Sequence, residues 1–262
     1  IDRGKKAAVR QLVQRELDAG HIEPSTSPWN TPVFVIKKKL GAWRLLRDLR
    51  AVNACIQDMG PLQAGLPSPA MIPPDYPIVV IDIRDCFFSV LLHEEDRVRF
   101  AFTVPEPNNQ HPCARYQWKV LPQGMKNSPV LCQIAVAAAI CPIRENFPTV
   151  IIFHYMDDVL LASNQEELLE KARVQLIVSL ERHGLHIEPR KTQVGRAVKY
   201  LGTQLRPRSV TAQSFEIRTT VTTLHEAQKL IGQLLWLRNF IPISEAEMTT
   251  LYQLLKGGDS PL

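Results

Sequence analysis

One stretch of the sequence decides the fold: Val150-Ile-Ile-Phe-His-Tyr-Met-Asp-Asp-Val-Leu-Leu-Ala162. Its two apolar runs are separated only by Met156-Asp157-Asp158. Two short runs of branched and aromatic side chains around a tight turn are typical of a β-hairpin. The sequence therefore predicts a hairpin with two adjacent carboxylates at its tip.

The two carboxylates of this hairpin need either a cation or free access to water. Asp157 and Asp158 repel each other, and a bound cation would relieve that repulsion. Successive residues of a strand point to opposite faces, so one of the two should be the stronger ligand unless the turn twists both to one side. An isolated Asp-Asp pair also fits a solvated acidic turn, and both interpretations stay open at this point.

A third acid stands at the end of another apolar run, Ile78-Val-Val-Ile-Asp-Ile83, which is typical of a strand buried on both faces. Together with this Asp82, the hairpin acids could hold two hard cations about 4 Å apart, an arrangement that activates a hydroxyl for phosphoryl transfer. Magnesium is the expected metal, and manganese is the alternative. Spacing along the sequence does not show that Asp82 meets Asp157.

The rest of the pattern indicates an α+β fold with a helical tail. Apolar residues at helical spacing predict an opening helix over Lys5–Ala19, and Val33–Ile36 and Trp43–Leu49 predict a basic hairpin. Capping boxes predict three later helix starts, at Ser163–Glu166, Thr223–Glu226 and Ser244–Glu247.

Composition narrows the class of protein. The 262 residues, 45% of them hydrophobic, suffice for one large core or a few subdomains. A net charge of +5 fits a partner that carries phosphates, but it is lower than that of a histone-like binder. The 5 cysteines form no CxxC pair, which suggests neither a zinc site nor a disulfide framework and fits a reducing compartment. The apolar stretch Val130–Ile143 is interrupted by Gln133 and Pro142 and is too short to span a bilayer, so we expect a soluble protein.

A series of motifs makes the chain resemble the retroviral reverse transcriptases. Tyr155-Met156-Asp157-Asp158 matches the YMDD motif of that family, and the wording of the motifs is nearest to the betaretroviral and alpharetroviral groups and their endogenous relatives. The resemblance covers essentially the whole chain. The companion motifs occur in the family's order: Trp43-Arg44-Leu-Leu-Arg-Asp-Leu-Arg50-Ala-Val-Asn53, Val80-Ile-Asp82-Ile-Arg-Asp85-Cys-Phe87-Phe-Ser, Leu121-Pro-Gln123-Gly124-Met-Lys-Asn-Ser-Pro129, Gly184-Leu-His-Ile-Glu-Pro-Arg-Lys191 and Tyr200-Leu201-Gly202.

The resemblance implies a metal site for two Mg²⁺ ions. Asp82, Asp157 and Asp158 would be its catalytic carboxylates, and Ile83 would lend a backbone carbonyl oxygen. His154 precedes the acidic turn, but imidazole is a softer ligand than Mg²⁺ prefers. We therefore assign His154 a packing role.

The resemblance also implies a site for deoxynucleoside triphosphates. The backbone around Asp85 and Cys86 would face the triphosphate, and Phe87 would exclude a ribose 2′ hydroxyl. The alternative for Phe87 is a core position beside Phe88. Further nucleotide contacts are implied for Lys38, Arg44 and Gln123, although a run of lysines is also typical of a solvated hairpin edge.

Residues nearer the C-terminus are implied to act on the leaving group and the primer. Lys191 would be a general acid for pyrophosphate, with a solvated loop lysine as the alternative. Leu201 and Gly202 would form the primer grip. Trp236 would follow the primer strand in the minor groove, or it is a buried residue of an amphipathic helix.

The family's fold is a right hand with an antiparallel palm sheet backed by helices. The resemblance places fingers at residues 1–57 and 90–127, palm at 58–89 and 128–207, and a partial thumb at 208–262, without connection or ribonuclease H domains. It implies a DNA polymerase that extends a primer on an RNA or DNA template. The expected location is the virion and host-cell cytoplasm, with no membrane partner. The resemblance does not decide between a monomer and a dimer. The alternatives are an inactive nucleic-acid-binding fragment and a two-metal nuclease.

Overall fold

The central sheet of the protein is antiparallel and has the strand order β7-β8-β4-β9. The structure is a computed structural model that describes residues 3–37, 41–63, 66–104, 112–212, 217, 220–238 and 240–255. The predicted hairpin is confirmed as β7 and β8, and the predicted buried strand as β4. The bounds are Ile78–Asp82 for β4, Ile151–Tyr155 for β7, Asp158–Ala162 for β8 and Gln193–Gly195 for β9.

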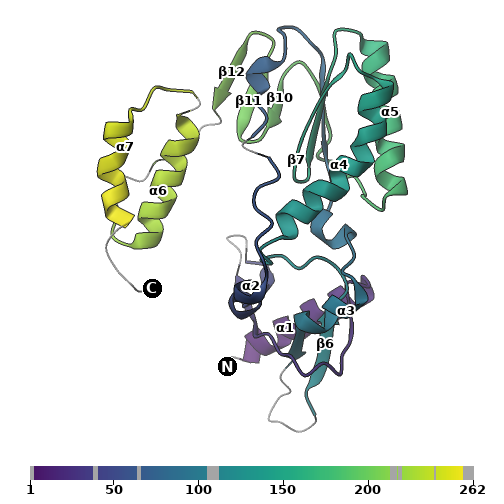
Figure 1. Cartoon of the computed structure of the whole chain (residues 1–262), viewed down its shortest axis with the longest axis vertical. Helices are drawn as coiled ribbons and strands as arrows, with labels where there is room; N and C mark the ends of the chain where they lie inside the picture. The colour runs from purple at the N-terminus through teal and green to yellow at the C-terminus, as the bar shows by residue number, and fades with distance from the viewer. Residues whose placement is uncertain are drawn as a thin grey trace.

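Strand β4 is buried on both faces because different elements cover its two sides. Val79 and Ile81 face the long helices α4 (Ser128–Asn146) and α5 (Glu166–Arg182) within one apolar cluster. The alternate residues Ile78 and Val80 pack in another cluster with the small sheet of β10–β12. Figure 1 shows the two helices on one side of the central sheet and the small sheet on the other. This small sheet consists of β10 (Val198–Tyr200), β11 (Thr203–Arg206) and β12 (Ser209–Ala212).

Helix α4 extends the apolar stretch Val130–Ile143 at both ends and is long and apolar enough to cross a bilayer by length and composition alone, so the prediction that this stretch is too short is wrong. Its buried residues, however, contact the central sheet and α5, as in a core helix. The helix continues through Pro142 to Asn146, and Gln133 is buried within it. A buried carboxamide in an apolar helix requires hydrogen-bond partners, which are described with the site below.

Two of the three predicted capping boxes are confirmed, and one is wrong. Helices α6 (Leu224–Leu237) and α7 (Glu245–Tyr252) begin with complete boxes at Thr223 and Ser244. Helix α5 instead begins at Glu166, with Gln165 as its N-cap and no side-chain cap. The hydroxyl of Ser163 is buried and accepts a hydrogen bond from the Gln165 N–H at 3.2 Å, so it forms a local turn before the helix.

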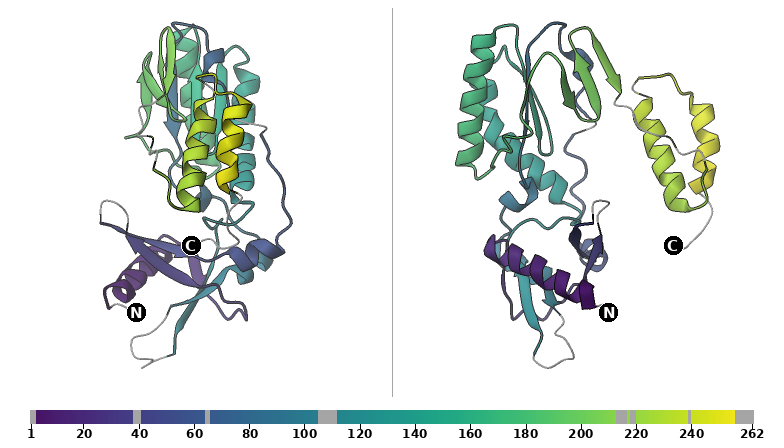
Figure 2. Two further views of the ribbon diagram at one scale, coloured as in Figure 1. Left: turned by 90° about the vertical axis from the view of Figure 1, so that its left-hand side faces the viewer. Right: turned by 180° about the vertical axis from the view of Figure 1, so that it is seen from behind.

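The N-terminal lobe contains the opening helix α1 (Arg3–Asp18), the hairpin β2–β3 and a three-stranded sheet of order β1-β6-β5. These elements share one apolar cluster centred on Phe102 and Trp118. Figure 2 shows this lobe at one end of the central sheet, joined to it by several chain crossings. The remaining bounds are β1 Ile22–Pro24, β2 Val33–Lys37, β3 Trp43–Arg47, α2 Arg50–Cys55, α3 Glu94–Arg97, β5 Ala101–Val104 and β6 Ala114–Trp118.

Helices α6 and α7 form a C-terminal pair on the side of the small sheet (Figure 1). Ala227 and Ile231 of α6 and Met248 of α7 are buried. The short 3₁₀ helix Gln253–Leu255 follows α7 and contacts α6. Helices, hairpins and antiparallel sheets thus make up an α+β fold, as the sequence predicts.

Candidate active site

The register of the central sheet brings the predicted acids together. Asp82 is the last residue of β4 and lies directly opposite Asp158, the first residue of β8. Just beyond this pair, the backbone N–H of Ile83 donates to the carbonyl oxygen of Asp157 at 2.8 Å. All three acids therefore lie at one end of the sheet, although Asp157 and Asp158 come 75 and 76 positions after Asp82 along the chain.

The turn that carries Asp157 has an unfavourable backbone conformation. Tyr155 pairs with Asp158 across the hairpin, so Met156 and Asp157 are the only two residues of the turn. Met156 has a φ of +54°, a region that side chains other than glycine, asparagine and aspartate rarely adopt. Its N–H donates to the side-chain oxygen of Gln133 in α4 at 3.1 Å. Such conformations persist where surrounding contacts enforce them, and they cluster at functional sites.

Crowding of the carboxylates changes the titration of Asp158. Burial, followed by the negative charges of Asp157 and Asp82, raises the pKa of Asp158 to about 6. The positive charge of Lys191 acts in the opposite direction. The ionised site is thus unfavourable by itself, and any added cation stabilises it.

Lys191 supplies such a cation to the neighbouring acid. Its ammonium group donates to both carboxylate oxygens of Asp82, at 3.0 and 2.9 Å, and the Asp82 side chain is 15% exposed. The hydrogen bond to Asp82 raises the pKa of Lys191. Two backbone bonds hold the lysine-bearing segment beside the end of β4: Arg84 N–H to the His186 carbonyl, and Glu188 N–H to the Asp82 carbonyl, both at 2.8 Å.

The acids fit a divalent metal by donor type and by register. Carboxylate and carbonyl oxygens are the ligands that Mg²⁺ prefers, and a bound cation would offset the repulsion of Asp157 and Asp82 that adds to the effect of burial on the pKa of Asp158. In the described part of the chain, no three histidine, cysteine or acidic side chains converge into a ready-made metal cage. The carboxylate of Asp82 points to Lys191 instead. Metal binding therefore requires the side chains to rearrange on a backbone that already places them together.

Comparison with known proteins identifies a family whose match includes the acidic residues of this site. The model of the reverse transcriptase (RNA-dependent DNA polymerase) family matches residues 36–205, which include all three acids and Lys191. The chain belongs to the reverse transcriptase family.

Relatives of high similarity are retroviral polyproteins. The chain is 49% identical over 259 residues to the Gag-Pro-Pol polyprotein of mouse mammary tumor virus (strain BR6), which covers 98% of this chain and 15% of that protein. It is 51% identical to the Gag-Pro-Pol polyprotein of squirrel monkey retrovirus, over 98% of this chain and 14% of that protein. A mouse intracisternal A-particle Pol-related polyprotein is 48% identical, over 97% of this chain and 29% of its own length. The chain thus spans less than a third of these relatives.

The residues that the reverse transcriptase resemblance assigns to the nucleotide follow β4 immediately. Ile83 is buried, and Asp85 adopts a left-handed conformation with φ +48°, after which Cys86–Ser89 forms a 3₁₀ turn. Cys86 is buried, and a hydrogen bond with the thiol of Cys132, followed by burial, raises its pKa. Phe87 is half-buried where two apolar clusters meet, so it has both a packed and an accessible part.

Gln123 lies in an exposed loop that the N-terminal lobe holds in place. Gly124 follows it with φ +94°. The side chain of Asn53 in α2 donates to the Gly124 carbonyl at 2.9 Å and accepts from the Lys126 N–H at 2.8 Å. Asn53 belongs to the motif that begins at Trp43, but its two hydrogen bonds to the Gln123 loop are not predicted by that motif. No pattern in the sequence indicates this contact.

The structure describes only one of the two basic residues that are expected to contact the triphosphate. Lys38 lies outside the described residues. Arg44 is exposed on β3 and pairs with Ile36 of β2 in the predicted basic hairpin. Its guanidinium is thus accessible to a ligand, and its contact with nucleotide stays a prediction.

The turn predicted to be the primer grip connects β10 and β11. Leu201 and Gly202 are its two residues, with φ of +45° and +78°. A Cβ atom at Gly202 would lie 3.1 Å from Cζ2 of Trp236, so the indole packs directly on this turn. Trp236 is half-buried and also contacts Phe240, with ring centroids 5.1 Å apart. The tryptophan therefore joins α6 to the turn.

Two glutamines behind the acidic turn were not predicted as site residues. In the sequence, Gln133 is evident only as an interruption of an apolar stretch, and Gln63 has no distinguishing pattern. The side chain of Gln133 donates to that of Gln63, which in turn donates to the His154 carbonyl at 3.3 Å. A polar residue inside an otherwise apolar helix is a sequence signal for such a network. His154 itself is buried, and burial followed by the charge of Arg144 lowers its pKa, which agrees with a packing role.

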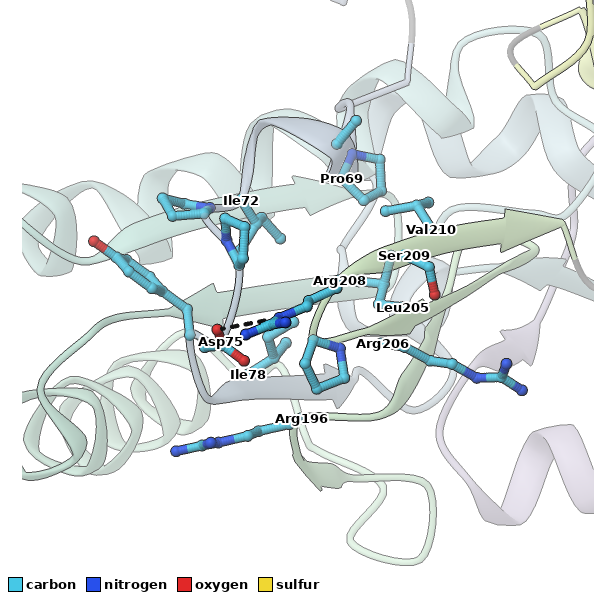
Figure 3. Close-up of a pocket in the computed structure, with 15 residues that line it drawn as sticks. Pro69, Ile72, Asp75, Ile78, Arg196, Leu205, Arg206, Arg208, Ser209 and Val210 are labelled. Atoms are coloured by element: carbon cyan, nitrogen blue, oxygen red, sulfur yellow. Dashed lines mark ion pairs between the residues drawn. The ribbon is translucent and has the colours of Figure 1, made fainter.

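A separate hollow of about 290 Å³ opens at the other end of β4, where Ile78 lines it. Arginines 196, 206 and 208 also line it, which suggests an anion site at first sight. Figure 3 shows that their side chains point in different directions, and Arg208 turns toward Asp75, with Nε 4.0 Å from a carboxylate oxygen. The three guanidinium groups therefore do not converge on one ligand.

Proposed function

We propose that this chain is the polymerase part of a reverse transcriptase, which adds deoxynucleotides to a primer 3′ end on an RNA or DNA template. The observation that carries the proposal is the register of β4 and β8, which places Asp82 opposite Asp158 with Asp157 on the adjoining turn. The family match supports RNA-directed DNA polymerase as the reaction class.

The three acids would hold two divalent cations, Mg²⁺ or Mn²⁺. When bound, these ions lower the pKa of the primer hydroxyl and neutralise charge on the transferring phosphate. The backbone brings the three acidic residues to one end of the central sheet, and the carbonyl oxygen of Ile83 would face the same ions. Little covalent chemistry is then required of the protein beyond positioning of the two reactants.

Lys191 would protonate the leaving pyrophosphate. A lysine ammonium group is protonated at neutral pH, as a general acid must be, and the hydrogen bond to Asp82 raises the pKa of Lys191. Its position on Asp82 places a proton donor beside the proposed metal ligands. A cation at this point also stabilises the negative charge that develops on the leaving group.

The incoming nucleotide would be held between the N-terminal lobe and the central sheet. In this proposal the lobe is the fingers, the central and small sheets with α4 and α5 are the palm, and α6 and α7 are part of a thumb. Arg44 and Lys38 would contact the triphosphate, the backbone at Asp85 and Cys86 would line it, and Gln123 would position the base. Leu201 and Gly202 would hold the primer end against these groups.

Phe87 would select deoxynucleotides through the bulk of its ring. Its half-buried ring is anchored between two apolar clusters and cannot easily move aside. A ribose 2′ hydroxyl would then collide with a fixed surface. The same argument explains why a flexible or smaller residue at this position would accept both sugars.

Primer extension with two sugars tests the proposal. The protein should extend a primer on RNA and DNA templates with deoxynucleotides and Mg²⁺, and discriminate against ribonucleotides. A Phe87→Val variant should lose most of this discrimination, whereas Phe88→Val, which changes a ring stacked on Trp118, should keep it. Template binding without extension would support an inactive binding fragment, and template cleavage would support a two-metal nuclease.

A further inference from the structure

The acidic turn has a backbone that its own sequence does not favour. Met156 adopts φ +54°, and a β-hairpin turn of two residues usually has glycine or asparagine in such a position. The direction of the Asp157 and Asp158 side chains depends on this conformation, because both follow Met156 directly. Something outside the turn must therefore keep Met156 in place.

The side chain of Gln133 makes that contact from α4. Gln133 is 4% exposed, and its Oε1 accepts the Met156 N–H at 3.1 Å. Its Nε2 donates to Oε1 of Gln63. Both ends of the buried carboxamide are thus used, one on the turn and one on the neighbouring segment.

Gln63 fixes which way the Gln133 carboxamide points. Because Gln63 accepts from Nε2, the oxygen of Gln133 is left to face Met156. The Nε2 group of Gln63 donates to the carbonyl of His154, two residues before Met156, at 3.3 Å. The two side chains therefore hold the hairpin at both His154 and Met156.

Only a neutral carboxamide meets all these conditions. A carboxylate at position 133 could accept from Met156 but could not donate to Gln63, and it would add negative charge beside acids that already repel one another. An apolar side chain would leave the Met156 N–H without this acceptor. The chemistry of the site thus accounts for a buried glutamine within an apolar helix.

We propose that Gln133 is a positioning residue for the catalytic acids, and that Gln63 orients it. Through Met156 the pair sets the directions of Asp157 and Asp158 and so determines how well they hold metal. This rests on the proposed function, in which these acids are metal ligands.

The test compares Gln133→Met, Gln63→Met and a matched control, Gln193→Met. Methionine keeps the length of glutamine and removes both hydrogen-bonding groups. Gln193 lies on β9 of the same sheet, and its carboxamide bonds twice to the backbone of Lys199, at 2.9 and 2.8 Å, outside the acidic turn. Mn²⁺ affinity is measured by electron paramagnetic resonance, alongside kcat, KM for the primer–template and the melting temperature.

We expect Gln133→Met to lower both Mn²⁺ affinity and kcat by about tenfold or more, because residues that orient metal ligands typically contribute that much. KM for the primer–template should stay unchanged. Gln63→Met, at a half-buried position, should show a smaller loss in the same direction. Gln193→Met should keep the wild-type Mn²⁺ affinity and kcat even if its melting temperature falls.

The experiment distinguishes failure of the positioning role from failure of the proposed function. If the wild-type protein extends primers but Gln133→Met keeps its Mn²⁺ affinity and kcat, the positioning role is wrong and the proposed function stands. If the wild-type protein binds Mn²⁺ without extending primers, the proposed function is wrong, and the Mn²⁺ affinities of the variants still decide the positioning role. If the wild-type protein does not bind Mn²⁺, both proposals are wrong.

Discussion

Two hairpin turns of this protein share an unfavourable backbone conformation, and different contacts stabilise each of them. The Met156–Asp157 turn joins β7 and β8, and the Leu201–Gly202 turn joins β10 and β11. The first residue of each is a large apolar side chain at positive φ, +54° for Met156 and +45° for Leu201. One turn carries a carboxylate in its second position, and the other carries a glycine.

The contacts that hold the two turns differ in kind. A hydrogen bond from Gln133 holds Met156, whereas the indole of Trp236 packs on Gly202. The acidic turn sits among charges, so a change there should act on chemistry. The other turn is stabilised by the packing of an indole ring, so a change there should act on stability and on primer binding. The predictions below test this separation.

Removing an acid should have the largest effect. Asp82→Asn should lower primer extension by about 10³-fold or more, because metal coordination supplies several kcal/mol of transition-state stabilisation. Steady-state incorporation of one deoxynucleotide measures this. Asp75→Asn is the control, since Asp75 is an exposed acid at the other end of β4. Equal activity of Asp82→Asn and the wild-type protein would remove Asp82 from the site.

Lys191→Met should lower kcat by about 10²-fold, the usual contribution of a general acid. Lys171→Met, an exposed lysine on α5, should have no such effect. Because the acid form is required, the wild-type rate should fall as pH rises through the pKa of the Lys191 ammonium group. This alkaline limb should disappear in Lys191→Met, and a limb that remains unchanged would assign the proton to another group.

Gly202→Ala should disturb packing more than catalysis. Gly184 is a matched control because it also has a left-handed φ, +72°, but nothing lies within 4 Å of a Cβ there, whereas Trp236 lies 3.1 Å from one at Gly202. Both substitutions should lose about 1 kcal/mol of stability through the backbone, and Gly202→Ala more through the collision. Urea unfolding gives the difference, and processivity assays should show earlier termination for Gly202→Ala alone. Equal stability losses would mean that Trp236 moves aside freely.

The smallest effect concerns stability in the absence of metal. The folded-state pKa of Asp158 is about 6, above its ordinary value of 3.8, so folding is opposed once this group is ionised. Asp158→Asn should therefore melt at a higher temperature than the wild-type protein at pH 8, and the gain should shrink as pH falls through 6 toward 4. Thermal melts in a chelating buffer measure this. A gain that does not depend on pH would mean that ionisation is not its cause.

The elements of the fold could be predicted because their signals are local. The continuous burial of Ile78 to Ile81 follows from a strand with both faces covered, and the capping boxes at Thr223 and Ser244 use neighbours three residues apart. The box at Ser163 failed because its hydroxyl is buried and bonds to Gln165 instead. A local signal is lost when tertiary burial gives the same atom another partner.

The candidate site could be predicted only in part. The residue types were evident from the sequence, but the pairing of Asp82 with Asp158 is a matter of strand register between distant segments. Only the family resemblance anticipated it. Neither the residue pattern nor the family resemblance indicates the hydrogen bonds between Gln133, Gln63 and the acidic turn. Side-chain contacts between a helix, a loop and a hairpin leave no periodic pattern in the sequence.

Primer extension on an RNA template with deoxynucleotides and Mg²⁺, comparing the wild-type protein with Asp157→Asn, tests the central claim most directly. The acidic turn should be the centre of catalysis, so the wild-type protein should extend the primer and the variant should not, while both bind the template equally. Extension by Asp157→Asn at the wild-type rate would contradict that claim.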